Sequence, residues 1–303
     1  MSTTTTTTTL LTKCNPLAPQ LTETVHTYLD KTWSFSSANY KSAFFEMDFP
    51  RLLALFCPEG PLDRLESAAL FVCLTGILDD AFSQMSIPAS REIGAKLLHI
   101  MQGTASADLS NPLEKILMKI INDMKTQNEE LANDVLKGAI ALFHAQTSKA
   151  RLEVAQLDEY FGFRYGDVGG EFFTALIRFV DNIVLTGSER DDFQYLERTV
   201  VRHMIIANDI LSWEKELKEA AESNQEGAEL CSAIPILTRN LGIGFEGAKR
   251  VLWVTARELE GEMEGLVEGL ELSPQGERYV QALKYMASGN EQWSGTTSRY
   301  KIY

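Results

Sequence analysis

An apolar segment from Leu62 to Leu78 constrains the fold of this chain more than any other part of the sequence. After Glu66 nearly every residue is apolar, and a helix that is hydrophobic all round lies in a protein core with other elements around it. The segment runs directly into Asp79 and Asp80. Two adjacent carboxylates are costly to remove from water without a partner. Either a metal ion binds there, or the helix end reaches solvent.

Helical patterns dominate the rest of the sequence, and strand signals are scarce. Glycine and proline separate the helical segments. We expect helices near residues 21–34, 37–48, 51–57, 62–86, 90–102, 111–124, 127–157, 170–186, 191–221, 229–239, 245–271 and 274–288. No repeat period emerges, so the prediction is a single all-α domain, a helical bundle, over residues 14–303. Residues 1–13 are threonine-rich and are expected to form a disordered tail, because they offer little apolar surface to offset ordering.

The long helix expected at residues 191–221 contains Asn208, Ser212 and Glu216. Residues four apart share one face of a helix, so these side chains would form a line of oxygen donors. Hard cations such as Mg²⁺ prefer oxygen ligands and keep coordination positions for water and phosphate. Lys215 would place an ammonium group beside the same site. The alternative is a solvated polar face, and the strongly apolar residues just upstream argue against it.

Charge and composition exclude some classes of function. The net charge of −14 disfavours a nucleic-acid binder, and it disfavours an anionic substrate unless bound cations invert the local field. The four cysteines are scattered without metal-ligand spacing, as is typical of reduced thiols. No secretory signal is evident and no segment is long and apolar enough for a membrane span. These features predict a cytoplasmic location.

The two polar motifs together resemble those of class I terpene synthases (terpene cyclases), of the fungal and bacterial sesquiterpene synthase type. In that family an aspartate-rich motif and an Asn-Ser-Glu motif hold three Mg²⁺ ions around a prenyl diphosphate. The resemblance implies that Asp79, with Asp80 beside it, forms the first motif and that Asp79 is a metal ligand. It implies that Asn208, Ser212 and Glu216 are the metal ligands of the second.

The resemblance extends to residues that would bind the diphosphate. Lys215 matches the family's diphosphate-binding lysine, and Arg164 resembles its diphosphate-sensing arginine. Arg299 and Tyr300 resemble the C-terminal Arg-Tyr motif, whose side chains grip the diphosphate in the closed state. That segment would help to close over the site as a lid.

Further positions follow from the same resemblance. Asp167 and Val168 match the linker and effector positions of the family, and Trp293 matches its pocket tryptophan. One position departs from the pattern, because Ser83 stands where the aspartate-rich motif normally carries a third acid. Four phenylalanines near the motifs are candidates for the pocket wall, but for each of them plain core packing is the favoured interpretation: Phe71, Phe82, Phe163 and Phe172.

The resemblance therefore implies a lyase that ionises a prenyl diphosphate and cyclises the carbocation. The resemblance to fungal members of this size, which lack a fused prenyltransferase domain, favours farnesyl diphosphate and a sesquiterpene, and geranylgeranyl diphosphate stays open. A chain-elongating prenyltransferase would need a second aspartate-rich motif where Asn208 to Glu216 stand. An inactive helical relic finds its support in Ser83. Assembly as a homodimer is left open.

Two other patterns imitate functional motifs. Gly242 to Gly247 fits G-x-G-x-x-G, but it follows a helical stretch and no strand, so we expect a turn between helices. Asp191 and Asp192 form a second aspartate pair in a polar loop, where we expect them to cap the start of the next helix.

Overall fold

The computed structural model describes residues 8–148, 154–222 and 230–301. Over these ranges the regular structure is helical throughout. The elements are α1 (Ala18–Thr32), α2 (Ala38–Glu46), α3 (Phe49–Phe56), α4 (Leu62–Phe82), α5 (Ile87–Met101), α6 (Pro112–Gln127), α7 (Glu129–Gln146), α8 (Leu157–Asp167), α9 (Gly170–Asp181), α10 (Gly187–Asp192), α11 (Gln194–Glu222), α12 (Ala233–Leu241), α13 (Phe245–Val267), α14 (Pro274–Thr296) and the 3₁₀ turn η3 (Ser298–Tyr300). The all-α prediction is confirmed.

Helix α4 is the centre of one half of the bundle. Every residue from Ser67 to Leu78 is buried, and the helix packs against α1, α3, α6 and α9. The expectation of a core helix is therefore confirmed. The helix ends at Phe82, four residues before the predicted end. The next helix, α5, begins at Ile87, three residues before the predicted start. Pro88 lies in its first turn, where proline is favoured.

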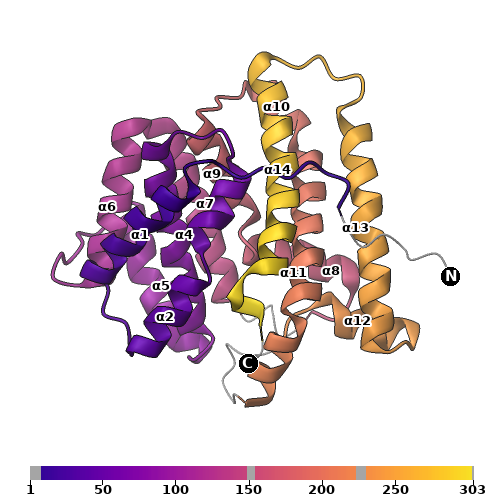
Figure 1. The fold of residues 1–303 in the computed structure, drawn as a ribbon, viewed down its shortest axis with the longest axis horizontal. Coiled ribbons are helices and arrows are strands. Elements are labelled where there is room, and N and C mark those ends of the chain that lie inside the picture. The colour runs from indigo at the N-terminus through magenta and orange to yellow at the C-terminus, as the bar shows by residue number, and fades with distance from the viewer. Residues whose placement is uncertain (1–7, 149–153, 223–229, 302–303) are drawn as a thin grey trace.

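Helix α11 is the centre of the other half and packs against α8, α13 and α14. Figure 1 shows α1 to α7 gathered on one side of the molecule and α11 to α14 on the other. One continuous hydrophobic core joins the two halves. Among the described helices, none is long and apolar enough to cross a membrane.

Glycines account for two errors in the predicted helix boundaries. Gly162 and Gly166 lie inside α8, which the sequence did not predict as a separate helix. Helix α14 continues to Thr296, past the predicted end at residue 288. Gly289 is needed there for packing, because a Cβ at this position would lie 2.9 Å from the Leu55 side chain of α3. A glycine at such a close approach permits contact between helices and does not end the helix.

The aspartate pair Asp191–Asp192 does not cap the start of a helix. Both residues lie at the end of the short helix α10, so that expectation was wrong. The capping acid is Glu189, which forms a capping box with Thr186. Its carboxylate also accepts a hydrogen bond from Ser273, the N-cap residue of α14. The turn at Gly242 and Gly244, by contrast, does separate α12 from α13 as predicted.

The expected N-terminal tail needs a correction for residues 8–13. Residues 1–7 lie outside the described residues. Thr8 donates to the Glu260 carboxylate of α13 at 2.7 Å, and the Thr9 backbone donates to it at 2.9 Å. Leu11 then accepts from Ser288 of α14 at 3.0 Å. Composition could not reveal this docking, because the buried carboxylate lies 251 and 252 residues further along the chain from Thr9 and Thr8. The domain boundary at residue 14 stays a prediction.

We predict that Glu189→Gln lowers the free energy of unfolding by about 1–2 kcal/mol at pH 7, because charge-assisted hydrogen bonds at two helix starts are weakened. Hydrogen bonds from Ser273 and the Thr186 backbone lower the pKa of Glu189 from 4.5 to about 2. A lowered folded-state pKa gives stability that is present above pH 4.5 and is lost as the pH falls towards 2.

Chemical denaturation of both proteins at pH 7 and in steps from pH 5 to pH 2.5 measures this effect. The difference between wild type and Glu189→Gln should shrink as the pH falls. Glu258→Gln, at an exposed position of α13, is the matched control and should leave stability unchanged. An equal, pH-independent loss in Glu189→Gln would contradict the role of the ionised carboxylate.

Candidate active site

Asp79 and Asp80 lie in the last turn of α4 and line a cavity. The Arg299 guanidinium donates to both carboxylates, at 2.7 Å to Asp79 Oδ2 and 2.9 Å to Asp80 Oδ1. The remaining oxygens accept from neutral donors, Gln146 of α7 at 3.3 Å and the Tyr40 hydroxyl of α2 at 3.0 Å. The aspartate pair therefore has the partners that charged groups need at the end of so apolar a helix.

Asn208, Ser212 and Glu216 follow one face of α11, as their spacing predicted. The Ser212 hydroxyl lies 2.7 Å from both Glu216 Oε1 and the Asn208 carbonyl. Asn208 Oδ1 accepts from Arg164 at 3.1 Å, and its Nδ2 donates to the Tyr300 hydroxyl at 2.7 Å. The oxygen donors of α11 thus contact residues from α8 and η3.

Asp209, the neighbour of Asn208, points into the protein interior and holds α11 in place. Its carboxylate accepts from the Tyr160 hydroxyl of α8, at 2.7 and 2.8 Å to its two oxygens, and from the Ala233 backbone at the start of α12 at 2.8 Å. Complete burial raises the pKa of Asp209 from 3.8 to about 7, against the opposing effect of nearby Arg164. One carboxylate therefore joins three helices behind the face that carries Asn208.

Helix α8 brings Arg164 and Asp167 to the cavity, where their side chains form an ion pair. Val168, the C-cap residue that follows α8, lines the cavity next to them. Lys215 of α11 pairs with Glu219 one helical turn later, at 2.7 Å. Arg299 of η3 pairs with the aspartates of α4, so each predicted cation of the site is paired with a carboxylate.

The turn between α2 and α3 holds the C-terminal part of the site. Trp293 of α14 donates from Nε1 to the carbonyls of Met47 and Asp48, at 3.1 and 3.0 Å. The Thr297 hydroxyl donates to the Met47 carbonyl at 2.8 Å. These bonds fix the end of α14, so that the Arg299 side chain, only 7% exposed, reaches the aspartate pair.

These side chains surround a cavity of about 220 Å³. The predicted site residues that line it are Asp79, Asp80, Arg164, Asp167, Val168, Asn208, Lys215, Glu216, Trp293, Arg299 and Tyr300. Ser212 is fully buried and reaches the site through its hydrogen bond to Glu216. The structure thus brings the predicted residues together from five elements, and their individual roles stay predictions.

The aromatic wall of the cavity comes from residues outside the set of four candidate phenylalanines. Phe49 and Phe173 line the cavity with Trp293. Within the described lining, none of the four candidates occurs: Phe71, Phe82, Phe163 and Phe172. Two of these pack edge-on in the core, Phe71 against Phe172, with ring centroids 5.0 Å apart. The favoured interpretation of core packing therefore agrees with the structure for these two, because a buried helix presents only one of its sides to the cavity.

The Phe49 ring occupies space that a glycine leaves open. A Cβ on Gly76 would lie 2.7 Å from two carbons of this ring, so a side chain at position 76 would force the ring to move. The Arg299 guanidinium lies over the ring, 5.5 Å from its centroid, and the Trp293 ring centroid lies 5.4 Å away. Asp79 follows Gly76 by three residues. The aromatic wall therefore adjoins the aspartate pair.

The donor set of the cavity suits a divalent metal. Its described lining contains the carboxylates of Asp79, Asp80, Asp167, Glu216 and Glu219, and the cations of Arg164, Lys215 and Arg299. Carboxylates are thus in excess, and the amide oxygen and hydroxyl of α11 add neutral oxygen donors. Hard cations such as Mg²⁺ prefer this chemistry. The residues present therefore fit the metal that the motifs imply.

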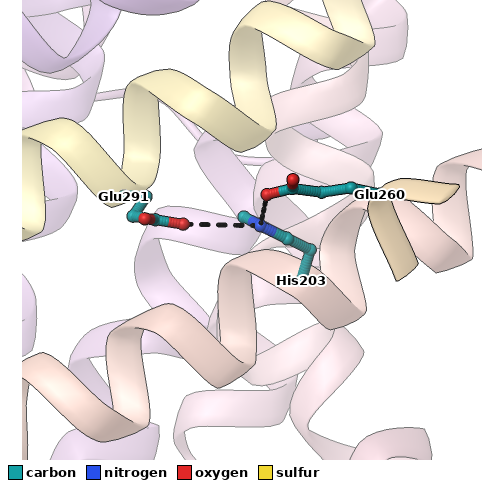
Figure 2. Close-up of side chains that lie close together, drawn as sticks. All are labelled: His203, Glu260 and Glu291. Carbon is teal, nitrogen blue, oxygen red and sulfur yellow. Dashed lines mark hydrogen bonds and ion pairs between the residues drawn. The ribbon is translucent and has the colours of Figure 1, made fainter. Parts of the chain in front are cut away.

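A second group of metal-binding side chains lies between α11, α13 and α14 (Figure 2). His203 Nε2 lies 3.1 Å from the Glu260 carboxylate and 3.5 Å from that of Glu291. Arg257 pairs with both carboxylates, at 2.8 Å to Glu260. The guanidinium supplies positive charge to the buried Glu260 carboxylate and the partly buried Glu291 carboxylate, so a metal ion would meet repulsion there. We interpret this group as a structural cross-link.

The sequence analysis missed Glu219 and Gln146 in the cavity lining, and it missed Tyr40, which donates to Asp80. Glu219 follows Lys215 by four residues, and the i,i+4 pairing of opposite charges was the signal that could have found it. Tyr40 and Gln146 carried no such signal, because they lie 40 and 67 residues from their aspartate partners. Burial and the nearby Asp80 carboxylate raise the pKa of Tyr40, so its hydroxyl is a donor at neutral pH.

Comparison with known proteins places this geometry in a family. A family model described as "Terpene synthase family 2, C-terminal metal binding" matches residues 70–260. The aristolochene synthase of Penicillium roqueforti is 32% identical over 292 residues, which cover 95% of this chain and 85% of that protein. The aristolochene synthase of Aspergillus terreus is 33% identical over 294 residues, which cover 95% of this chain and 92% of that protein.

Solved structures share the fold. The crystal structure of aristolochene synthase from Penicillium roqueforti matches with a TM-score of 0.84 at 30% identity, over 96% of this chain and 98% of that chain. Hedycaryol synthase in complex with HEPES, at 18% identity and a TM-score of 0.75, shares the fold over 94% of this chain and 95% of its own. The region matched by the family model includes both the aspartate pair and the oxygen donors of α11. The chain therefore belongs to the terpene synthase family.

Proposed function

We propose that this protein is a Mg²⁺-dependent terpene cyclase that ionises farnesyl diphosphate and closes the carbocation into a sesquiterpene. One observation carries the proposal: the aspartate pair of α4 and the oxygen donors of α11 face one cavity that also contains three cationic side chains. The similarity to aristolochene synthases over nearly the whole chain favours a sesquiterpene product and so farnesyl diphosphate.

Ionisation breaks the allylic C–O bond, and both bonding electrons leave with the diphosphate. Arg164 and Arg299 have planar donor forks that match phosphate oxygens, whereas Lys215 acts as a point charge. The Tyr300 hydroxyl adds a neutral donor. Donors placed where negative charge develops lower the barrier to bond cleavage.

Three Mg²⁺ ions, held from the protein side by Asp79, Asn208, Ser212 and Glu216, would supply further neutralisation of the leaving group. The chain's own cations must meanwhile exchange partners. Arg299 now contacts the aspartate pair, and diphosphate oxygens would take the place of those carboxylates. Arg164, now paired with Asp167 next to Val168, would likewise exchange this carboxylate for diphosphate oxygens. The resemblance assigns this response to the effector segment.

The cavity wall then determines what becomes of the carbocation. Its apolar lining includes Leu52, Val72, Leu142, Phe173 and Met204, which exclude water from the reacting chain. The rings of Phe49 and Trp293 offer π faces that stabilise positive charge. Loss of a proton from the cyclised cation gives a hydrocarbon, and capture of water gives an alcohol.

The direct test is incubation of the purified protein with geranyl, farnesyl and geranylgeranyl diphosphates, under a solvent overlay and with Mg²⁺ or EDTA. Gas chromatography with mass spectrometry should find a cyclic C15 product from farnesyl diphosphate that EDTA abolishes. A cyclic C20 product would instead identify a diterpene synthase. A longer linear diphosphate, seen only with added isopentenyl diphosphate, would identify a prenyltransferase. The absence of any product with every substrate would favour the inactive relic.

The cytoplasmic location and the homodimer stay separate predictions from the sequence. Fractionation of source cells tests the location, and light scattering on the purified protein tests the oligomeric state.

We predict that Asn208→Ala and Glu216→Ala each lower the turnover number at least about 100-fold, the scale of losing one electrostatic group at a reacting centre. Each change removes an oxygen donor from the cavity face of α11. Lys218→Ala, at an exposed position of the same helix, is the matched control and should retain activity. Circular dichroism should show the same helicity in all three. Turnover near the wild-type value in either site variant would contradict the metal assignment.

We also predict that Gly76→Ala changes the product mixture. The added Cβ would lie 2.7 Å from the Phe49 ring, so the ring must move and reshape the wall beside the aspartate pair. Gly261→Ala makes the same change in α13, where no atom lies within 4 Å of the new Cβ, and should leave the products unchanged. The ratio of products by gas chromatography is the measurement. An unaltered ratio in Gly76→Ala would show that the Phe49 ring does not shape the reaction.

A further inference from the structure

The four oxygens of the aspartate pair are divided between two kinds of donor. One oxygen of each carboxylate, Asp79 Oδ2 and Asp80 Oδ1, accepts from the Arg299 guanidinium. The other oxygen of each accepts from a neutral side chain, Gln146 for Asp79 and Tyr40 for Asp80. Each carboxylate is therefore held from two sides, by one charged donor and one neutral donor.

The two kinds of donor differ in what they can do when a ligand enters. A guanidinium competes with metal ions for carboxylates and is attracted to phosphate, so Arg299 would leave the pair when diphosphate binds. A neutral hydroxyl or amide does not oppose a nearby cation. Tyr40 and Gln146 can therefore keep their hydrogen bonds while the oxygens released by Arg299 turn to the metal. Hydrogen-bond partners of this kind orient the carboxylates that bind metals.

Tyr40 is placed rigidly enough for this task. It lies in the first turn of α2, where its backbone N–H donates to the Ser37 side chain at 3.0 Å. Its ring packs beside the rings of Phe35 and Phe44, with centroids 6.1 and 6.2 Å away. Packed aromatic neighbours restrict the ring, so the hydroxyl is presented to Asp80 in one position. The same helix packs against η3, which carries the arginine.

The fifth position of the motif makes this support more important. The Ser83 hydroxyl donates to the Asp80 backbone carbonyl at 2.9 Å, so it is engaged in ending the helix. Ser83 therefore supplies no charge to the metal-binding set, which is left with two carboxylates on α4. With fewer ligands available, the orientation of the remaining pair counts for more.

We propose that Tyr40 and Gln146 are positioning residues that hold Asp80 and Asp79 in the orientation that binds metal, with Tyr40 the more important. The proposal rests on the proposed function, because it assumes that the aspartate pair takes part in metal binding. It assigns to α2 and α7 a role in that site. The hydrogen bond of Tyr40 is the shorter, at 3.0 Å against 3.3 Å for Gln146.

Tyr40→Phe tests this, because it removes the hydroxyl and keeps the ring. Free Mn²⁺ is measured by electron paramagnetic resonance while the full-length protein is titrated with Mn²⁺ in the presence of inorganic diphosphate. We expect the Mn²⁺ dissociation constant to rise about 10-fold in Tyr40→Phe and less in Gln146→Ala, in line with losses of outer partners at metal sites. Tyr28→Phe is the matched control on α1, where the ring lies against Lys119, and it should bind Mn²⁺ as the wild type does.

A double-mutant cycle separates positioning from a general loss of structure. If Tyr40 acts through Asp80, Tyr40→Phe should weaken Mn²⁺ binding much less in an Asp80→Asn background than in the wild type. Equal losses in both backgrounds would overturn the proposal for Tyr40. The Gln146→Ala and Asp79→Asn cycle gives an independent answer should Tyr40→Phe fail to fold by circular dichroism.

The outcomes distinguish this proposal from the function on which it rests. A wild type that neither binds Mn²⁺ with diphosphate nor converts any prenyl diphosphate would remove the proposed function. A wild type that does both, while Tyr40→Phe and Gln146→Ala retain its Mn²⁺ affinity, would remove only the positioning role.

Discussion

The site depends on ion pairs between elements that an apolar core brings together. Helix α4 is buried on all sides along most of its length and ends in two carboxylates, which would be costly there without partners. Arg299 offsets this cost from the far end of the chain, and the ion pairs Arg164–Asp167 and Lys215–Glu219 do the same for the facing helices. In the absence of substrate the cavity is thus neutralised largely by its own side chains. The cations that would bind diphosphate are already paired with carboxylates, so ligand binding would exchange these partners.

Much of the fold and of the site followed from local rules. The helical class, the buried α4 and the single face of α11 depend on periodicity within one element, which a sequence displays directly. The errors arose where a residue's role depends on a distant element. The last helix was predicted to end at residue 288, yet it continues to Thr296, and Gly289 permits contact with Leu55. Phe49 lines the cavity because α3 packs against α4, whereas Tyr40 and Gln146 reach the aspartate pair from α2 and α7. No spacing in the sequence indicates these contacts.

Asp209 and the cross-link around His203 show that buried charge also does structural work away from the cavity. The Asp209 carboxylate holds α8 and the start of α12 against α11, immediately next to a residue of the cavity wall. On the opposite flank, Arg257 and Glu260 join α13 to the N-terminal segment and to α14. Because α11 is held in this way, the orientation of its cavity face is decided by contacts on its other faces. A terpene synthase needs that rigidity, since positive charge must be handled by groups already in place.

The wide separation of Arg299 from its partners has a consequence for how the protein is made. Asp79 precedes Arg299 by 220 residues, and translation at 5–20 residues per second leaves the carboxylate without its guanidinium for roughly 10–45 s. During that time α4 can already be covered by α1, α3 and α6, which are synthesised soon before or after it. The nascent protein can therefore bury this apolar helix early and leave the acidic end of that helix exposed to solvent. The set of cations that would bind an anionic ligand is therefore completed only near the end of synthesis, when Arg299 is added.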